Sequence, residues 1–275
     1  MHTQTADFLK IYTIHHIPVE MPETDILFPI DAGISTGDNI AKNNNWSELR
    51  VHYWVYKNEP LADYVGFFHF RRYLYPKIIK SKRPYIFKNK PEKSDYTSEV
   101  WNSIVKDQDI IAPRAEYTGL SVYERYACYE NQNIDDLLSV VEILKSQHPD
   151  YADATERYLQ GKEEYYGNIF VMKKELFREY CSWLFPILDQ FREKNINAKP
   201  RTEGYLAERL FGIWLTYQKQ KNKKVSFLPR VHFSCYDDNN HKRSFKRILF
   251  DFFFTPGSKR RGFVNAKHLK KHKNT

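Results

Sequence analysis

Hydrophobic positions fall into short apolar runs that alternate with amphipathic stretches along the chain. The runs at residues 8–15 and 64–68 are rich in aromatic and β-branched side chains and have the length of buried strands. Between them, apolar residues recur at helical spacing over about residues 45–57. Strand and helix patterns continue to alternate up to residue 233, which predicts an α/β domain.

The other predicted elements follow the same two periods. Short apolar runs predict strands, and apolar stripes at helical spacing predict helices. The predicted strands are 25–30, 109–113, 165–172 and 225–233, and the predicted helices are 98–105, one or two within 122–147, 173–191 with Pro186 as a kink or end, and 204–218. Residues 77–96 carry seven Lys and Arg and two prolines, which predicts a surface loop, either a solvated insertion or a mobile lid.

A dense polar cluster follows the apolar run 64–68. It contains His69, Arg71 and Arg72. Ligands of open α/β sheets bind at the carboxyl ends of strands, so a binding group is expected here. Two guanidiniums suit a phosphate or pyrophosphate, because each presents planar donors and neither loses its charge. The alternative is that both arginines pair with carboxylates at the sheet edge.

The charge of the chain is concentrated at its end. The formal net charge is +9, but residues 241–275 alone hold eleven Lys and Arg against one acid, Asp251. The other 240 residues hold 32 bases and 33 acids. The sequence therefore divides into a domain of residues 1–240 and a basic amphipathic tail of residues 241–275. A near-neutral body argues against the alternative of a basic nucleic-acid-binding protein, so no nucleic-acid partner is expected.

Cysteine spacing and hydropathy bear on the compartment. Cys128, Cys181 and Cys235 are isolated, which fits a reducing cytosol and argues against a structural zinc site. No window reaches the roughly 18 apolar residues of a membrane span, and the first ten residues lack a signal-peptide core. A soluble cytoplasmic protein is expected.

Several stretches together resemble one family. They are PIDAGISTGDNI with the following NNNWSELRVHYWVYKN, then DYVGFFHFRRYL, YYGNIFVMKKELFREYCSWLFPIL and RTEGYLAERLFGIWL. The chain resembles, over roughly residues 10–233, a bacterial domain-of-unknown-function family of capsule, exopolysaccharide and O-antigen loci whose members are assigned as galactofuranosyltransferases. The resemblance implies a GT-A-like (Rossmann-like) glycosyltransferase domain. It further implies an inverting transfer of galactofuranose from UDP-galactofuranose to a glycan acceptor of a surface polysaccharide such as lipopolysaccharide. A hexopyranosyltransferase with another nucleotide sugar is the alternative.

The resemblance also implies which residues form the site. The family pattern is matched by Thr-Gly-Asp-Asn at 36–39, by His-Phe-Arg-Arg at 69–72, by Tyr-Gly-Asn at 166–168 and by Ala-Glu-Arg at 207–209. His15 and His16 depart from the His-Lys pair that usually follows the first strand. The implied donor-binding residues are Asp38, Asn39, His69, Arg71, Arg72, Gly167 and Asn168.

Catalysis needs stabilisation of the leaving diphosphate and a base for the acceptor hydroxyl. Many GT-A enzymes carry a metal-binding Asp-x-Asp where this chain has His69-Phe70-Arg71, so cationic side chains are expected to replace the metal and no cofactor is required. A divalent metal remains an alternative, with Asp38 as a ligand or as an Asx-turn residue.

Two carboxylates are candidates for the base. Glu208 and Glu203 lie five residues apart near the start of the last helix and must project in different directions. The family match favours Glu208. Its alternative role is a salt bridge with Arg209 or Arg201.

The tail has two interpretations. Residues 245–254 interleave bases with Phe, Ile and Leu, which is typical of a segment that lies on an anionic membrane surface. The tail would then hold the enzyme at the inner face of the plasma membrane, beside a lipid-linked acceptor. The alternative is that these aromatics pack on the domain and that residues 259–275 form a disordered solubilising end.

Overall fold

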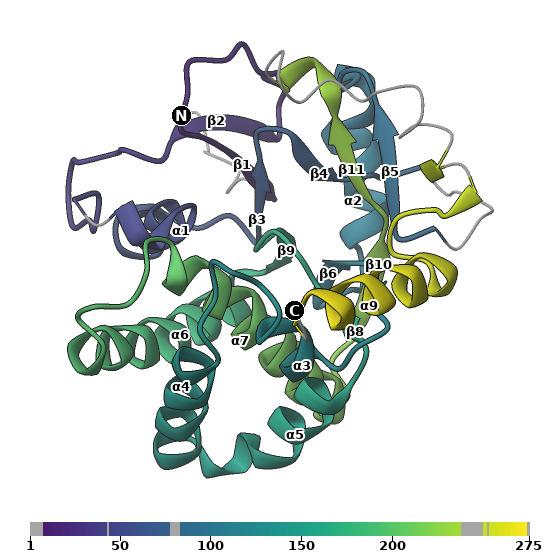
Figure 1. Cartoon of the computed structure of the whole chain (residues 1–275). Helices are drawn as coiled ribbons and strands as arrows, with labels where there is room; N and C mark the ends of the chain where they lie inside the picture. Colours follow the sequence, from purple (N-terminus) through teal and green to yellow (C-terminus); the bar gives the residue numbers. More distant parts are fainter. Residues whose placement is uncertain (1–7, 43, 78–82, 238–249, 252, 274–275) are drawn as a thin grey trace, which may run out of the picture.

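A nine-stranded mixed sheet forms the centre of the molecule (Figure 1). The computed structural model describes residues 8–42, 44–77, 83–237, 250–251 and 253–273. The strands of the main sheet are β1 (Leu9–His15), β2 (Leu27–Asp31), β3 (Tyr64–His69), β4 (Arg72–Leu74), β5 (Tyr85–Lys88), β6 (Ile110–Pro113), β9 (Phe170–Lys173), β10 (Val225–Leu228) and β11 (Arg230–Phe233). A second, two-stranded sheet pairs β7 (Glu116–Tyr117) with β8 (Glu163–Glu164).

The central strand of the sheet is β3. The strand order is β10-β6-β9-β3-β4-β11-β5, and β1 also pairs with β3 and carries β2 on its other side. β1 runs parallel to both β2 and β3, whereas β9 runs antiparallel to β3 and β6. The α/β prediction is confirmed in the form of a mixed sheet. The carboxyl ends of β1, β2 and β3 meet at one edge, where ligands of open α/β sheets bind.

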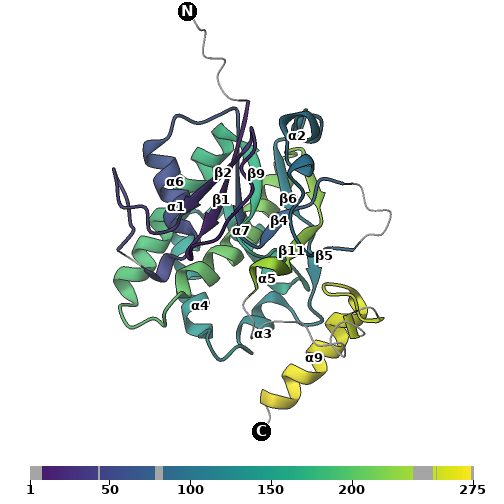
Figure 2. The same cartoon turned by 90° about the horizontal axis from the view of Figure 1, so that it is seen from above.

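Helices cover both faces of this sheet. Figure 2 shows α1 and α6 on one side and α2 on the other. The α-helices are α1 (Leu49–Asn58), α2 (Ser98–Val105), α3 (Val122–Tyr126), α4 (Ile134–Gln147), α5 (Ala152–Gln160), α6 (Lys174–Lys194), α7 (Thr202–Gln220) and α9 (Lys259–Lys273). The short 3-10 helices are η1 (Asn44–Trp46), η2 (Lys93–Asp95), η3 (Pro149–Tyr151) and η4 (Ser234–Tyr236).

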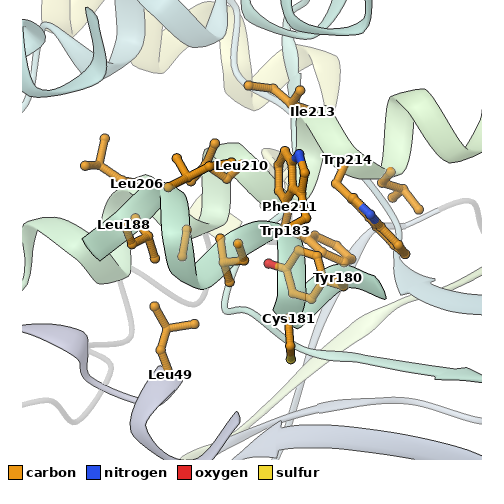
Figure 3. Packing of buried hydrophobic residues seen from close by; sticks show 14 of the residues in the cluster. Leu49, Tyr180, Cys181, Trp183, Leu188, Leu206, Leu210, Phe211, Ile213 and Trp214 are labelled. Carbon is orange, nitrogen blue, oxygen red and sulfur yellow. The ribbon is translucent and has the colours of Figure 1, made fainter. Parts of the chain in front are cut away.

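Alternate residues of β3 supply two separate cores. Val65 and Phe67 pack with the helices of the larger core, whereas Tyr64 and Phe68 pack on the face covered by α2. In the larger core, rings of α6 meet rings of α7 (Figure 3). The ring of Tyr180 lies 5.0 Å from that of Trp214. The two cores fix β3 from both faces, so the polar residues that follow it start from a rigid strand.

Most predicted elements are confirmed, and four are corrected. The predicted strand 165–172 begins only at Phe170, where β9 starts. The predicted strand 225–233 is two strands, because Pro229 ends β10 and β11 then pairs with β4 and β5. The predicted loop 77–96 contains β5, while residues 78–82 lie outside the described residues. Of the two outcomes predicted for Pro186, a kink or a helix end, the helix end is wrong, since α6 continues to Lys194.

The described part of the tail packs on the domain. Gly262 of α9 lies so close to Tyr117 that an added Cβ would come within 2.6 Å of its ring, and Ala266 is buried. Arg261 is buried and donates a 2.8 Å hydrogen bond to Asp251. Residues 259–273 form helix α9, so the predicted disordered end is wrong for them. Residues 241–249 and 252, which carry part of the membrane prediction, lie outside the described residues. Within the described chain, no helix is both long and apolar enough to span a bilayer.

Candidate active site

A cavity of about 310 Å³ opens at the carboxyl ends of the parallel strands. β1 contributes His16 from the residue after its end, and β3 contributes His69 from its last position. The remaining wall comes from the turn between β3 and β4, from the residues just before α1, from Gly167 before β9, and from Arg201 and the first turns of α7. The full lining is His16, Ser47, Glu48, His69, Arg71, Arg72, Gly167, Arg201, Gly204, Tyr205 and Glu208.

A neighbouring cavity of about 230 Å³ shares part of this wall. It reaches the end of β2 through Ala32 and includes Arg50 of α1. The shared residues are His16, Ser47, Glu48, His69 and Arg201. The two hollows together form one trough, which we call the donor trough after the donor-binding residues that the family resemblance implies here.

Cationic side chains dominate the donor trough. Burial, followed by the charges of Arg72 and Arg71, holds the pKa of His69 well below 6.5. Burial, followed by Arg201, also lowers the pKa of His16. Both imidazoles are therefore neutral near pH 7. The arginines keep their charge, so the trough concentrates positive potential.

The arginine pair differs in its partners. Arg71 lies 3.4 Å from a carboxylate oxygen of Asp237, so the sheet-edge pairing applies to this residue. Arg72 hydrogen-bonds the phenol of Tyr85, and no ion pair between Arg72 and a carboxylate occurs within the described residues. Burial, followed by the charge of Arg230, lowers the pKa of Arg72. A largely desolvated guanidinium without a counter-ion is costly unless an anion binds it.

Two further polar atoms in the same region have no hydrogen-bond partner among the described residues. They are the Nδ1 atom of His69 and the Nε atom of Arg71, and both are buried. A buried donor without an acceptor costs about 1–3 kcal/mol. A ligand with several oxygens would satisfy these atoms and would neutralise Arg72.

Glu208 lines the trough as the family match implied. Its Oε1 atom accepts a 2.6 Å hydrogen bond from the backbone N–H of Gly167, and its Oε2 atom accepts one of 3.2 Å from Arg209. Gly167 has φ +93°, a backbone region that favours glycine. The carboxylate of Glu208 therefore holds the turn that leads into β9.

Glu203 lies elsewhere. Its side chain is fully buried and pairs with Arg192 of α6. The two glutamates do project in different directions, as their spacing required, and Glu203 does not line the donor trough. Its ion pair with Arg192 joins α7 to α6.

Asp38 and Asn39 do not line the donor trough either. The carboxylate of Asp38 accepts a 3.1 Å hydrogen bond from the Tyr53 hydroxyl. The amide of Asn39 donates to the carbonyls of Ser35 and Gly37, and its oxygen accepts from Ala41. These contacts shape the loop and attach it to α1. Asn39 forms an Asx turn with Ala41, whereas the carboxylate of Asp38 bonds a side chain of α1, which differs from the Asx turn expected for it.

Asn168 has a different role from the one that the resemblance implied. Its side-chain amide donates a 2.8 Å hydrogen bond to Glu48 Oε1 and a weaker one to the Gly204 carbonyl. The residue is buried and has φ +48°. Asn168 therefore ties the start of α1 to the start of α7, behind the wall of the trough.

Glu48 is the site residue that sequence reasoning missed. It precedes Leu49, the first residue of α1, and lines both parts of the donor trough. Burial raises its pKa, and the neighbouring charge of Glu208 adds to this effect. The stretch around it was interpreted only as a helix start. The available signal was an acid at the amino end of the helix that leads directly into β3.

A further cavity of about 480 Å³ adjoins the trough at Arg71 and Arg72. β5 contributes Tyr85 and Phe87 to its wall, and the tail contributes Asp251, Pro256 and Arg261. We call this hollow the tail cavity. Its position places the described tail residues beside the arginine pair.

The described residues contain no group of three His, Cys, Asp or Glu side chains that could hold a metal ion. The end of β3 presents imidazole and guanidinium groups instead. These are donors for oxyanions, and the guanidiniums are not ligands for a divalent cation.

Comparison with known proteins adds a family and a fold. Residues 10–221 match the model of a domain of unknown function, DUF4422. Among solved structures, the chain is similar to the apo structure of the bifunctional glycosyltransferase WbbM, with a TM-score of 0.76 and 31% sequence identity. The match covers 83% of this chain and 46% of that one, so the chain spans about half the length of WbbM. The curated proteins contain no significant match.

Proposed function

Because the chain belongs to the DUF4422 family, we propose that it is a glycosyltransferase, as the likeness to half of WbbM suggests. The donor is UDP-galactofuranose, and the sugar is transferred with inversion to a glycan acceptor of a bacterial surface polysaccharide. The domain is of the GT-A-like kind. The mixed sheet and the similarity to a glycosyltransferase structure support this assignment.

The observation that carries the proposal is the charge of Arg72, the first residue of β4, which forms no ion pair within the described residues. A diphosphate would bring two negative phosphates to Arg72 and Arg71 and would accept a hydrogen bond from His69. Charge-assisted hydrogen bonds of this kind are about twice as strong as neutral ones. They would also stabilise the charge that develops on the leaving diphosphate.

The same residues carry the proposal that no metal is required. Guanidiniums stand at the strand end where a metal-binding carboxylate pair would otherwise be expected. Turnover should then persist in EDTA. Strong inhibition by EDTA that manganese reverses would contradict metal independence while leaving the transferase proposal intact.

The tail supports a proposal about the acceptor. Phe253 and Phe263 are 61% and 55% exposed, and Lys259, Arg260 and Lys267 of α9 are exposed as well. Rings and bases together suit an anionic membrane surface, where each Lys or Arg contributes about 1 kcal/mol. The tail cavity would then receive a lipid-linked acceptor next to the arginine pair.

Membrane attachment is tested by co-sedimentation with liposomes of anionic phospholipid. The full chain should sediment with them, and added salt should weaken the binding. The variant Phe253→Ser/Phe263→Ser should bind less while its fold and its activity on a short soluble acceptor remain. Absence of binding by the full chain at low salt would contradict peripheral attachment.

The transferase activity is tested with UDP-galactofuranose and a panel of lipid-like glycan acceptors. NMR of the product should show a new β-galactofuranosyl linkage. UDP-galactopyranose is the matched control, because it differs only in ring size. Transfer from the pyranose donor alone would support a hexopyranosyltransferase, and consumption of neither donor would contradict the proposal.

A further inference from the structure

Two carboxylates line the donor trough, and the reaction needs one proton acceptor. They are Glu48, just before α1, and Glu208 of α7. The family match pointed to Glu208. The contacts of the two side chains point to a different division of roles, which rests on the proposed transferase function.

Glu208 is held by the scaffold of the site. One carboxylate oxygen accepts from the Gly167 N–H and the other from Arg209, whose side chain is only 3% exposed. Protonation of this carboxylate would weaken both contacts and would release the turn at Gly167. A group with these partners is suited to position the wall of the trough.

Glu48 has a different set of partners. Its Oε1 atom accepts from the neutral amide of Asn168, and its own backbone N–H also contacts the carboxylate. It forms no ion pair with any described residue, although Arg201 and Arg50 lie in the same wall. Proton uptake by Glu48 therefore breaks no salt bridge.

The surroundings of Glu48 also favour proton transfer. Burial raises the pKa of Glu48, which brings a carboxylate closer to the pH at which a general base works best. The charged and titratable groups that face it come from every neighbouring element. They are His16 after β1, His69 at the end of β3, Arg71 and Arg72 in the turn into β4, Arg50 of α1, Arg201 just before α7, and Tyr205 and Glu208 of α7.

We propose that Glu48 is the general base of the transfer and that Glu208 is a positioning residue. A carboxylate oxygen of Glu48 takes the proton of the acceptor hydroxyl. The hydroxyl oxygen forms the bond to the anomeric carbon, the bond from that carbon to the diphosphate breaks, and its electron pair leaves with the diphosphate. Arg71 and Arg72 receive the negative charge.

The first test compares isosteric variants. Glu48→Gln should lower kcat by about 10²–10⁴-fold, the usual contribution of a general base. Its Kd for UDP should remain within roughly threefold of wild type. Glu142→Gln on the exposed face of α4 is the matched control and should behave as wild type.

A nucleophile without a proton separates base catalysis from a structural role. Azide is anionic and needs no base, so Glu48→Ala should transfer the sugar to azide at a rate close to that of wild type. Mass spectrometry of the glycosyl azide gives the readout. Glu208→Ala should transfer poorly to azide and to the natural acceptor alike, because the wall of its trough is disturbed.

The pH profile gives a third readout. Asn168→Ala removes a hydrogen bond that favours the charged form of Glu48, so its pKa should rise and the acid limb of the kcat profile should move to higher pH. Thermal unfolding checks that the variant is folded.

Failure of the inference is distinct from failure of the proposed function. If wild type binds and turns over the donor but Glu48→Gln remains fully active, Glu48 is not the base. Loss of turnover in Glu208→Gln, together with azide transfer by Glu208→Ala, would assign the base to Glu208. If wild type neither binds UDP nor consumes any donor, the transferase proposal itself is wrong.

Discussion

Two arginines of this fold, the buried Arg209 and the half-buried Arg72, differ in their surroundings. Arg209 of α7 lies between Glu164 and Glu208 and over the ring of Tyr126. Arg72, the first residue of β4, has a phenol and further cations as neighbours, and the charge of Glu208 acts on it without forming an ion pair. Burial opposes the charge of Arg209, but its carboxylate partners outweigh this and raise its pKa. Burial and Arg230 lower the pKa of Arg72.

Arg209 forms ion pairs that stabilise the fold, whereas we propose that Arg72 binds a ligand. The carboxylates around Arg209 come from β8 and α7, so this cluster holds distant segments together. Arg72 is held in place by the sheet and has no carboxylate partner among the described residues. The absence of a carboxylate partner among the described residues is the reason why we propose an anionic ligand for Arg72.

The largest expected effect is loss of stability when the paired arginine is removed. Arg209→Met leaves Glu164 buried with Arg125 as its remaining cation. The free energy of unfolding in urea should fall by about 3–5 kcal/mol. A loss below about 1 kcal/mol would mean that the cluster does not hold the fold together.

Removal of Arg72 should reduce turnover without reducing the free energy of unfolding. Arg72→Met should leave the free energy of unfolding unchanged or higher, because a poorly compensated charge is replaced by an apolar chain of similar length. Donor turnover should fall by about two or more orders of magnitude. Full activity in this variant, with circular dichroism like that of wild type, would show that the diphosphate binds elsewhere. Arg71→Ala should also reduce turnover.

A smaller effect is expected from a histidine that faces no ligand. Burial lowers the pKa of His52 in α1 to about 3, and its ring packs 4.1 Å from that of Phe67. Because the unfolded chain takes up this proton near pH 6.5, stability is lost as the pH falls below that value, by about 1.4 kcal/mol per unit. Between pH 6.5 and 5, His52 therefore accounts for about 2 kcal/mol.

The variant His52→Leu checks this contribution. Urea unfolding at several pH values should show a weaker acid dependence than in wild type. The remaining dependence belongs to other histidines with lowered pKa, such as His69. An unchanged pH slope in the variant would contradict the assignment to His52.

The sequence predicted the parts of the fold that depend on local patterns. The limits of α2 agree with its apolar stripe, and the apolar run 64–68 is β3 within one residue. β5 was missed because its partner β11 lies far along the chain, and a basic, proline-containing stretch resembles a loop until that partner is known. Pro229 separates two strands that a continuous apolar pattern does not distinguish.

The site was predicted in part for a similar reason. His69, Arg71 and Arg72 follow directly from the end of a strand, and Glu208 from the family match. Asp38 and Asn39 lie in a stretch whose composition is typical of a ligand-binding loop. In the structure, Asn39 hydrogen-bonds within that loop and Asp38 attaches it to Tyr53 of α1. Glu48 could not be selected from the sequence, because its hydrogen-bond partner Asn168 lies 120 residues later in the chain.

The central claim is that Arg72, together with Arg71, binds the diphosphate of a nucleotide sugar beside the end of β3. Calorimetric titration of the full chain with UDP tests it most directly. The account predicts one site per chain, with affinity reduced at least tenfold in Arg72→Met and unchanged in Glu142→Gln. Equal affinity in wild type and Arg72→Met, or no heat of binding in wild type, would contradict the claim.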